Sequence, residues 1–199
     1  MTRRALLLID MQNDFCAVEG ALGRRGEDLR SVQDAVTVAG HLLDVARRTD
    51  TLRILVRVVH GGRLDDGSWG SRHRGRGASH ADRKAVEGEW GSEFYRLSPL
   101  SGDVVLTKTR YSAFVGTPLR QILRGARVDE VLLCGTQTDV CVLTTAFDAI
   151  QEGYDVSVVS AAVGSTRPAL HEAALEIVRN RCGPVVGVDE AISLIETSD

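Results

Sequence analysis

The feature that most constrains the fold is a regular alternation of short apolar runs with longer amphipathic stretches. Runs this short and this apolar are typical of strands buried on both faces, and the stretches between them have helical periodicity. A strand–helix alternation of this kind predicts a parallel sheet with helices on both sides. The predicted strands cover residues 5–9, 53–59, 104–107, 130–134, 155–160 and 185–188.

Helix signals fall between these strands. Asp28 is expected to cap a helix to about residue 48, Thr117-Pro118 to open a helix to about Gly125, and Asp189 to cap the last one. Further helices are predicted over residues 138–153 and 168–182. We therefore predict one three-layer α/β/α domain over residues 1–199, with a six-stranded, mainly parallel, doubly wound sheet of the Rossmann-like order 3-2-1-4-5-6.

Size and charge exclude several classes of protein. A chain of 199 residues is long enough for one well-buried α/β domain and short for two. Its net charge of -3 gives no electrostatic case for binding nucleic acid or an anionic membrane. No apolar run approaches the ~20 residues that span a bilayer. The partner we expect is therefore a small-molecule substrate.

The cysteines and the first residues indicate the compartment. Cys16, Cys134, Cys141 and Cys182 are scattered and form no CxxC pair, so they indicate neither a disulfide framework nor a zinc site. The basic start is followed by an apolar run of about five residues, shorter than the roughly 7–15 of a signal peptide. A reducing cytoplasm is the expected location.

One segment interrupts the alternation. Residues 61–91 are polar and rich in glycine and arginine. A loop of this length within a compact domain is usually functional or disordered. It is either a solvated excursion or a functional element, namely a lid over a site or an arm that reaches a neighbouring subunit.

Cys141 is the strongest candidate for a nucleophile. An apolar strand ends near Gly135, a polar turn follows, and a helix is expected from about Thr138. The thiol would then lie in the first turn of a helix, where unpaired N–H groups and the helix dipole favour a thiolate. A buried structural cysteine needs no such setting.

Two further polar residues follow strands. Asp10 follows the first predicted strand and Lys108 follows the third, and ligands of doubly wound sheets bind beyond such carboxyl ends. Taken singly, each has a plain structural explanation: a turn aspartate, a surface lysine and a core cysteine. Taken together, the carboxylate can accept the proton of Cys141, and the ammonium can hold both neighbours in their charged forms. In the predicted order, however, Lys108 starts two strands from Asp10, about 10 Å away.

These residues also carry a resemblance. Asp10-Met-Gln-Asn-Asp-Phe15, Lys108-Thr-Arg-Tyr-Ser-Ala-Phe and Gly135-Thr-Gln-Thr-Asp-Val-Cys141 occur in the order found in the isochorismatase-like cysteine hydrolases. The resemblance implies an Asp10–Lys108–Cys141 triad and a cis peptide bond at Thr136–Gln137. It also implies an oxyanion hole made by the backbone N–H groups of Gln137 and Cys141, and a homodimer or homotetramer.

The resemblance further narrows the chemistry. Isochorismatases proper carry no cysteine at the nucleophile position, so Cys141 indicates hydrolysis of a C–N bond through a thioester. Nicotinamidases of the family bind a metal through an Asp-x-His pair, but this chain has Val58-Val59-His60 there. We therefore predict no metal and no cofactor, and expect His60 to contact the substrate.

The remaining substrate-binding predictions are aromatic. The run around Trp90, followed by Tyr111, is similar to the branch of carbamoyl and ureido amidohydrolases, in which they would form walls around a small planar group with Phe15 opposite. Thr136 joins this set from the turn before Cys141. Plain packing is the alternative for Trp90 and Tyr111. The arginines of the 61–91 loop suit a substrate carboxylate.

Other classes of function stay open. A nucleotide-binding oxidoreductase would suit the fold, but no GxGxxG follows the first strand. A nicotinamidase-type amidase, an ether hydrolase and a binding protein without catalysis would share the same fold. A Cys141–His60 pair is the alternative arrangement of catalytic groups.

Overall fold

The six predicted strands form one sheet in a computed structural model of the chain, which describes residues 2–61 and 84–198. All neighbouring strands pair in parallel, in the order β3-β2-β1-β4-β5-β6, so the predicted order is confirmed. The strands are β1 Arg4–Ile9, β2 Leu52–Val58, β3 Val104–Lys108, β4 Glu130–Thr136, β5 Asp155–Gly164 and β6 Val185–Val186.

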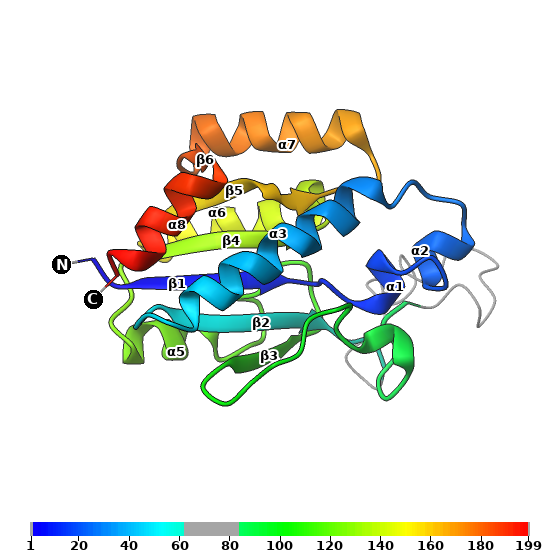
Figure 1. The fold of residues 1–199 in the computed structure, drawn as a ribbon, viewed down its shortest axis with the longest axis horizontal. Coiled ribbons are helices and arrows are strands. Elements are labelled where there is room, and N and C mark those ends of the chain that lie inside the picture. The colour runs from blue at the N-terminus through cyan, green and yellow to red at the C-terminus, as the bar shows by residue number, and fades with distance from the viewer. Residues whose placement is uncertain (1, 62–83, 199) are drawn as a thin grey trace.

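Helices cover both faces of this sheet (Figure 1). Side chains of β1 alternate between two cores: Leu6 and Leu8 pack with α3 and α8, whereas Leu7 and Ile9 pack with α5, α6 and α7. Burial on both faces explains why β1 is apolar throughout. The helices are α1 Asn13–Cys16, α2 Ala21–Arg24, α3 Arg30–Ala46, α5 Leu119–Gly125, α6 Leu143–Gln151, α7 Pro168–Arg181 and α8 Val188–Glu196.

Helix starts differ most from the predictions. The N-cap of α3 is Leu29, while Asp28 accepts a hydrogen bond from the backbone N–H of Arg30. The N-cap of α8 is Gly187, and Asp189 lies in its first turn. The predicted helix over 138–153 begins as a π-helical turn, Thr138–Val142, before α6. Sequence patterns predict the position of a helix well but its first residue poorly, because tertiary contacts decide which of several neighbouring residues becomes the N-cap.

The segment that follows the carboxyl end of β1 is held by hydrogen bonds of the Gln12 side chain. The Gln12 side chain donates hydrogen bonds to the carbonyls of Val58 (2.9 Å) and Ser92 (2.8 Å), and it accepts one from the N–H of Val58 (2.8 Å). These bonds attach the end of β1 to β2 and to a 3₁₀ turn, Trp90–Ser92. They fix the segment from which Asp10 projects.

None of the helices in residues 2–61 and 84–198 is long and apolar enough to cross a membrane. Of the 61–91 loop, residues 62–83 lie outside the described part of the chain, so the lid and arm interpretations and the loop arginines stay predictions.

Candidate active site

Three strand ends meet at one place in the sheet. Ile9, the residue before Asp10, pairs with Gly135 of β4 on one side and with Val56 of β2 on the other. Cys141 follows β4, and Lys108 is the last residue of β3. The site therefore lies at the carboxyl edge, where the winding of the sheet reverses, as the sequence predicted.

The structure brings Asp10, Lys108 and Cys141 into contact. Lys108 Nζ lies 2.7 Å from Asp10 Oδ2 and 3.6 Å from Cys141 Sγ, and it donates a third hydrogen bond to the Arg110 carbonyl at 2.9 Å. The expected gap of two strands is closed by register. Lys108 pairs with Val58, two residues beyond the partner of Ile9, so its side chain reaches over the end of β2.

The charges of this cluster are enclosed. Asp10 and Lys108 are each 1% exposed. Burial raises the pKa of Asp10, although Lys108 and its hydrogen bond oppose the rise. Burial alone would lower the pKa of Lys108, but the negative charge of Asp10, then the interactions with Cys141 and the hydrogen bonds to both groups, outweigh it, so the pKa of Lys108 ends above its ordinary value. The lysine therefore stays charged beside its two neighbours.

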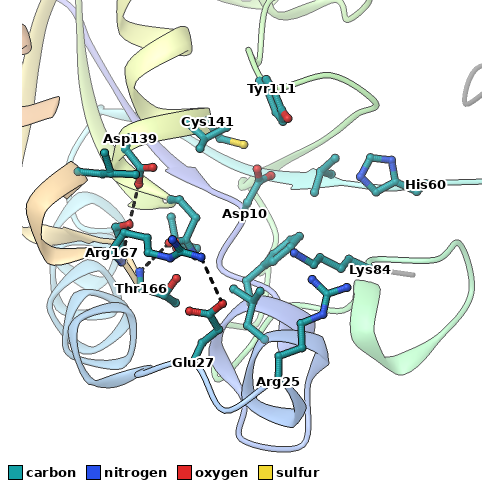
Figure 2. A pocket seen from close by; sticks show the side chains of 18 of the residues that line it. Asp10, Arg25, Glu27, His60, Lys84, Tyr111, Asp139, Cys141, Thr166 and Arg167 are labelled. Carbon is teal, nitrogen blue, oxygen red and sulfur yellow. Dashed lines mark hydrogen bonds and ion pairs between the residues drawn. The ribbon is translucent and has the colours of Figure 1, made fainter. Parts of the chain in front are cut away.

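The pKa of the Cys141 thiol differs from the sequence prediction. A helix N-terminus was expected to favour a thiolate, yet burial, and then the charge of Asp10, raise the pKa of Cys141. Cys141 is only partly exposed, and most of its surroundings are protein. A proton lost to solvent would leave an extra buried charge, whereas a proton passed to Asp10 keeps the net charge of the cluster at zero. Figure 2 shows the sulfur of Cys141 facing the carboxyl group of Asp10.

The turn between β4 and Cys141 depends on a glycine. Gly135 has a φ of 142°, and a Cβ there would lie 2.4 Å from the carbonyl oxygen of Ile9. The Thr136–Gln137 peptide bond that follows is cis, the geometry that the resemblance implied. Gln137 Oε1 accepts a hydrogen bond from the Thr166 N–H at 2.8 Å. That the N–H groups of Gln137 and Cys141 form an oxyanion hole stays a prediction.

Three buried polar atoms around the thiol lack partners. Asp10 Oδ1, Thr136 Oγ1 and Gln137 Nε2 have no hydrogen bond within the described residues, and all three side chains line one cavity. Native proteins rarely leave buried polar groups unpaired, and each exception needs a reason. A cavity wall with an unpaired carboxylate oxygen, hydroxyl and amide beside a cysteine is suited to a polar ligand.

The cavity has a volume of about 410 Å³. It contains most of the predicted substrate-binding side chains, namely Phe15, His60, Tyr111 and Thr136. The predicted role of Trp90 as a wall of the substrate site is corrected, because Trp90 is not among the described residues that line the cavity and is 49% exposed. Its backbone carbonyl instead accepts a hydrogen bond from Asn13 Nδ2 at 2.8 Å.

Sequence reasoning missed several charged residues of the cavity wall. Arg167 forms an ion pair with Glu27 at 3.8 Å, and Asp139 accepts a hydrogen bond from the Ser165 hydroxyl at 2.6 Å (Figure 2). Arg167 and Glu27 come from loops distant in sequence, without a periodic pattern that could have indicated them, whereas Asp139 lies in the π-helical turn that also carries Cys141. The other missed polar lining residues are Arg25, Lys84, Arg110 and Thr166.

Metal ligands were not predicted, and the relevant residues are only partly described. His60 lines the cavity, but no three His, Cys, Asp or Glu side chains gather as a metal-binding group within residues 2–61 and 84–198. His73 and His80 lie outside the described residues. The absence of a metal stays a prediction.

The chain is similar in sequence to several known proteins. The maleamate amidohydrolase of Pseudomonas putida is 31% identical over 191 residues, covering 94% of this chain and 84% of that protein. The phenazine biosynthesis protein PhzD1 of Pseudomonas aeruginosa is 38% identical over 124 residues, but the match covers 62% of this chain and only 55% of that protein.

Solved structures extend the likeness to the whole fold. An isochorismatase family protein from Desulfovibrio vulgaris superposes with a TM-score of 0.83 at 32% identity, covering 98% of this chain and 99% of that one. The model of the isochorismatase domain matches residues 4–190, which include all three clustered residues of the site. The family expected from the sequence is thus confirmed: this chain belongs to the isochorismatase family.

Proposed function

We propose that the protein is a cysteine-dependent hydrolase that cleaves the C–N bond of a small amide through a thioester on Cys141. The observation that carries the proposal is the contact of Lys108 with both Asp10 and Cys141, beside a cavity wall with unpaired polar atoms. A thiol, a proton acceptor and a fixed cation are the groups that acyl transfer to sulfur requires. The name of the maleamate amidohydrolase relative supports an amide substrate.

In the first half-reaction, Cys141 gives its proton to the unpaired oxygen of Asp10, and the sulfur bonds to the carbonyl carbon. The carbonyl electron pair moves to oxygen, which accepts hydrogen bonds from the N–H groups of Gln137 and Cys141. One such donor can contribute ~3 kcal/mol. When the intermediate collapses, the C–N bond breaks and Asp10 returns the proton to the departing nitrogen.

In the second half-reaction, water gives a proton to Asp10 as its oxygen attacks the thioester carbon. The C–S bond then breaks, and the proton on Asp10 returns to the sulfur of Cys141. The raised pKa of Asp10 suits a group that accepts and releases a proton in each half-reaction. Lys108 contacts both groups, so it faces the negative charge whichever of them carries it.

The test is ammonia release from a panel of nicotinamide, N-carbamoyl amino acids, biuret, ureidoacrylate-type compounds and maleamate. Cys141→Ala should lower kcat on any active substrate by about a thousandfold or more. Cys182→Ala is the matched control, because this half-buried thiol does not line the cavity within the described residues. Undiminished turnover by Cys141→Ala would exclude a thioester.

The intermediate itself can be observed. Rapid acid quenching during turnover, followed by mass spectrometry of the Cys141 peptide, should show the mass of the acyl group on the sulfur. An acyl group found on another side chain, with Cys141 unmodified, would assign the nucleophile elsewhere and contradict the proposal.

A further inference from the structure

The side chain of Gln137 carries a hydrogen-bond donor that the hydrolysis mechanism does not use, since that mechanism involves only the backbone N–H of this residue. Gln137 lines the cavity, and its Nε2 atom is buried without a hydrogen bond within residues 2–61 and 84–198. A donor removed from water without an acceptor costs a protein about 1–3 kcal/mol. Such a donor on the wall of a cavity indicates that a ligand supplies the acceptor.

The orientation of the Gln137 amide is fixed by the backbone. Gln137 Oε1 accepts a hydrogen bond from the N–H of Thr166 at 2.8 Å. A backbone N–H can only donate, so the side-chain atom that it contacts must be the oxygen, and the nitrogen takes the other position. Nε2 offers N–H groups and no lone pair, so the ligand atom that it lacks is a hydrogen-bond acceptor.

The loop that holds this amide is itself fixed. Ser165 Oγ donates a hydrogen bond to Asp139 Oδ1 at 2.6 Å and accepts one from the N–H of Arg167 at 3.1 Å. Asp139 lies in the π-helical turn that begins directly after Gln137, so the loop and the turn are bonded to each other at two points. A donor held in this way keeps its direction before a ligand arrives, which lowers the entropic cost of binding.

The charges on this side of the cavity favour an uncharged acceptor. Asp139, Glu27 and Arg167 lie near Thr166 in Figure 2. Two of these three side chains are negative and one is positive, and the positive one, Arg167, forms its ion pair with Glu27 at 3.8 Å. A substrate carboxylate would meet net negative charge here, whereas a keto or ether oxygen accepts the same hydrogen bond without that repulsion.

We propose that Gln137 is a specificity-determining residue whose side chain selects amides with a second, uncharged oxygen acceptor. The inference rests on the proposed function and specifies the substrate of that reaction. The backbone N–H and Nε2 belong to one residue, so the second oxygen must lie within a few bonds of the reacting carbonyl group. Because Nε2 is already shielded from water, the substrate oxygen gains this hydrogen bond without removing water from the donor.

Pairs of amides that differ in one oxygen test this role. Acetoacetamide has a keto oxygen where 3-methylbut-3-enamide has a methylene group, and methoxyacetamide has an ether oxygen where butyramide has a methylene group. The measured quantity is the ratio of kcat/KM for the oxygen compound to kcat/KM for its hydrocarbon analogue. The intrinsic reactivities of the two amides are the same for every variant, so they cancel when variants are compared with the wild type.

Gln137→Glu and Gln137→Met separate the donor from its support of the loop. Glutamate keeps an oxygen for the N–H of Thr166 but replaces the donor by a second oxygen, whereas methionine removes both groups. At about pH 8.5, where glutamate is ionised, the ratio should fall about tenfold or more in Gln137→Glu and about tenfold in Gln137→Met. If Gln137 only supported the loop, Gln137→Glu would keep the wild-type ratio, and that result would refute the proposal.

Gln151→Met is the matched control, since this exposed glutamine on α6 is not among the described residues that line the cavity. It should leave the ratio unchanged. If neither Gln137 variant changes the ratio while amides are still hydrolysed, the specificity role is refuted and the proposed function stands.

Binding to Cys141→Ala decides the case in which no amide is hydrolysed, which would contradict the proposed function itself. NMR titration of this variant with acetoacetamide and with 3-methylbut-3-enamide needs no turnover. Tighter binding of acetoacetamide, with the ratio of the two dissociation constants reduced about tenfold by an added Gln137→Glu substitution, would still support the role of Gln137. Equal affinities for the two compounds would overturn it.

Discussion

Replacing Lys108 by methionine should destabilise the protein in a way that depends on pH. Methionine keeps much of the volume of the side chain and removes the charge together with the hydrogen bonds that the ammonium donates. The ammonium of Lys108 lies 2.7 Å from Asp10, and both side chains are essentially buried. Removing one partner of a buried pair leaves the other charge unsolvated, which costs about 3–5 kcal/mol.

Asp10 can avoid this cost by keeping a proton. In Lys108→Met, burial still raises the pKa of Asp10, and its main opposing charge is gone. The unfolded chain ionises Asp10 near pH ~3.9, so above that pH the folded variant holds one proton more than the unfolded one. Its free energy of unfolding should therefore fall by about 1.4 kcal/mol per pH unit until Asp10 ionises in the folded state.

The free energy of unfolding of the wild type should fall less over this pH range. The pKa of Lys108 is raised, so its stabilising contribution is fully present below the lysine value of the unfolded chain and is lost only as pH rises through the raised value. The difference in the free energy of unfolding between Lys108→Met and wild type should thus be small near pH 4 and grow toward about 3–5 kcal/mol near neutral pH.

Urea unfolding followed by circular dichroism at several pH values between about 4 and 8 measures this difference. The double variant Asp10→Asn/Lys108→Met removes both charges. Its free energy of unfolding should exceed, by about 2 kcal/mol or more, the value predicted by adding the losses of the two single variants. Arg124→Met, an exposed charge, should stay within about 0.5 kcal/mol of wild type. A deficit independent of pH, or additive single and double variants, would refute the reasoning.

Three further predictions concern the surroundings of the site. Asp14→Asn should lower the free energy of unfolding by about 2 kcal/mol and raise KM, because both oxygens of Asp14 accept backbone N–H groups and asparagine keeps only one such oxygen. An unchanged melting temperature and KM would contradict this prediction. Gly91→Ala should destabilise by at least about 2 kcal/mol, since its Cβ would lie 2.1 Å from Asp14 Oδ2. Gly125→Ala is the comparison, because a Cβ at Gly125 would have no atom within 4 Å, and it should be neutral or slightly stabilising. Equal urea midpoints for Gly91→Ala and Gly125→Ala would contradict this prediction. Asp10→Asn should abolish turnover yet shift the pH profile of Cys141 alkylation to lower pH, because the Asp10 charge raises the pKa of the thiol; a shift to higher pH would show that the sign is wrong.

Much of the fold could be read from local patterns. Apolar runs such as 5–9 and 130–134 are buried on both faces, and a parallel sheet needs long connections that the intervening helices supply. The ends of the helices were less predictable. Asp28 and Asp189 are good capping residues by type, but Leu29 and Gly187 occupy the cap positions, because packing against the sheet sets where each helix begins.

The site divides in the same way. Asp10, Lys108 and Cys141 were identifiable because each follows a strand, and parallel strands place their carboxyl ends along one edge. Whether Lys108 could reach the other two depended on the register between β2 and β3, which no local pattern encodes. Trp90 was misplaced for the related reason that an aromatic residue in a loop has no periodicity to orient it.

The sequence by itself therefore determined the class of fold, the family and the chemical groups at the strand ends, because these follow from periodicity and from motifs continuous in the chain. The tertiary structure alone decided the environment of those groups. The raised pKa of Cys141 arises mainly from burial in the folded chain, and the attachment of α2 and of the backbone at Ala85 to one carboxylate arises from the two hydrogen bonds of Asp14. Burial and polar contacts are properties of neighbours in space, and they exist only once the chain has folded.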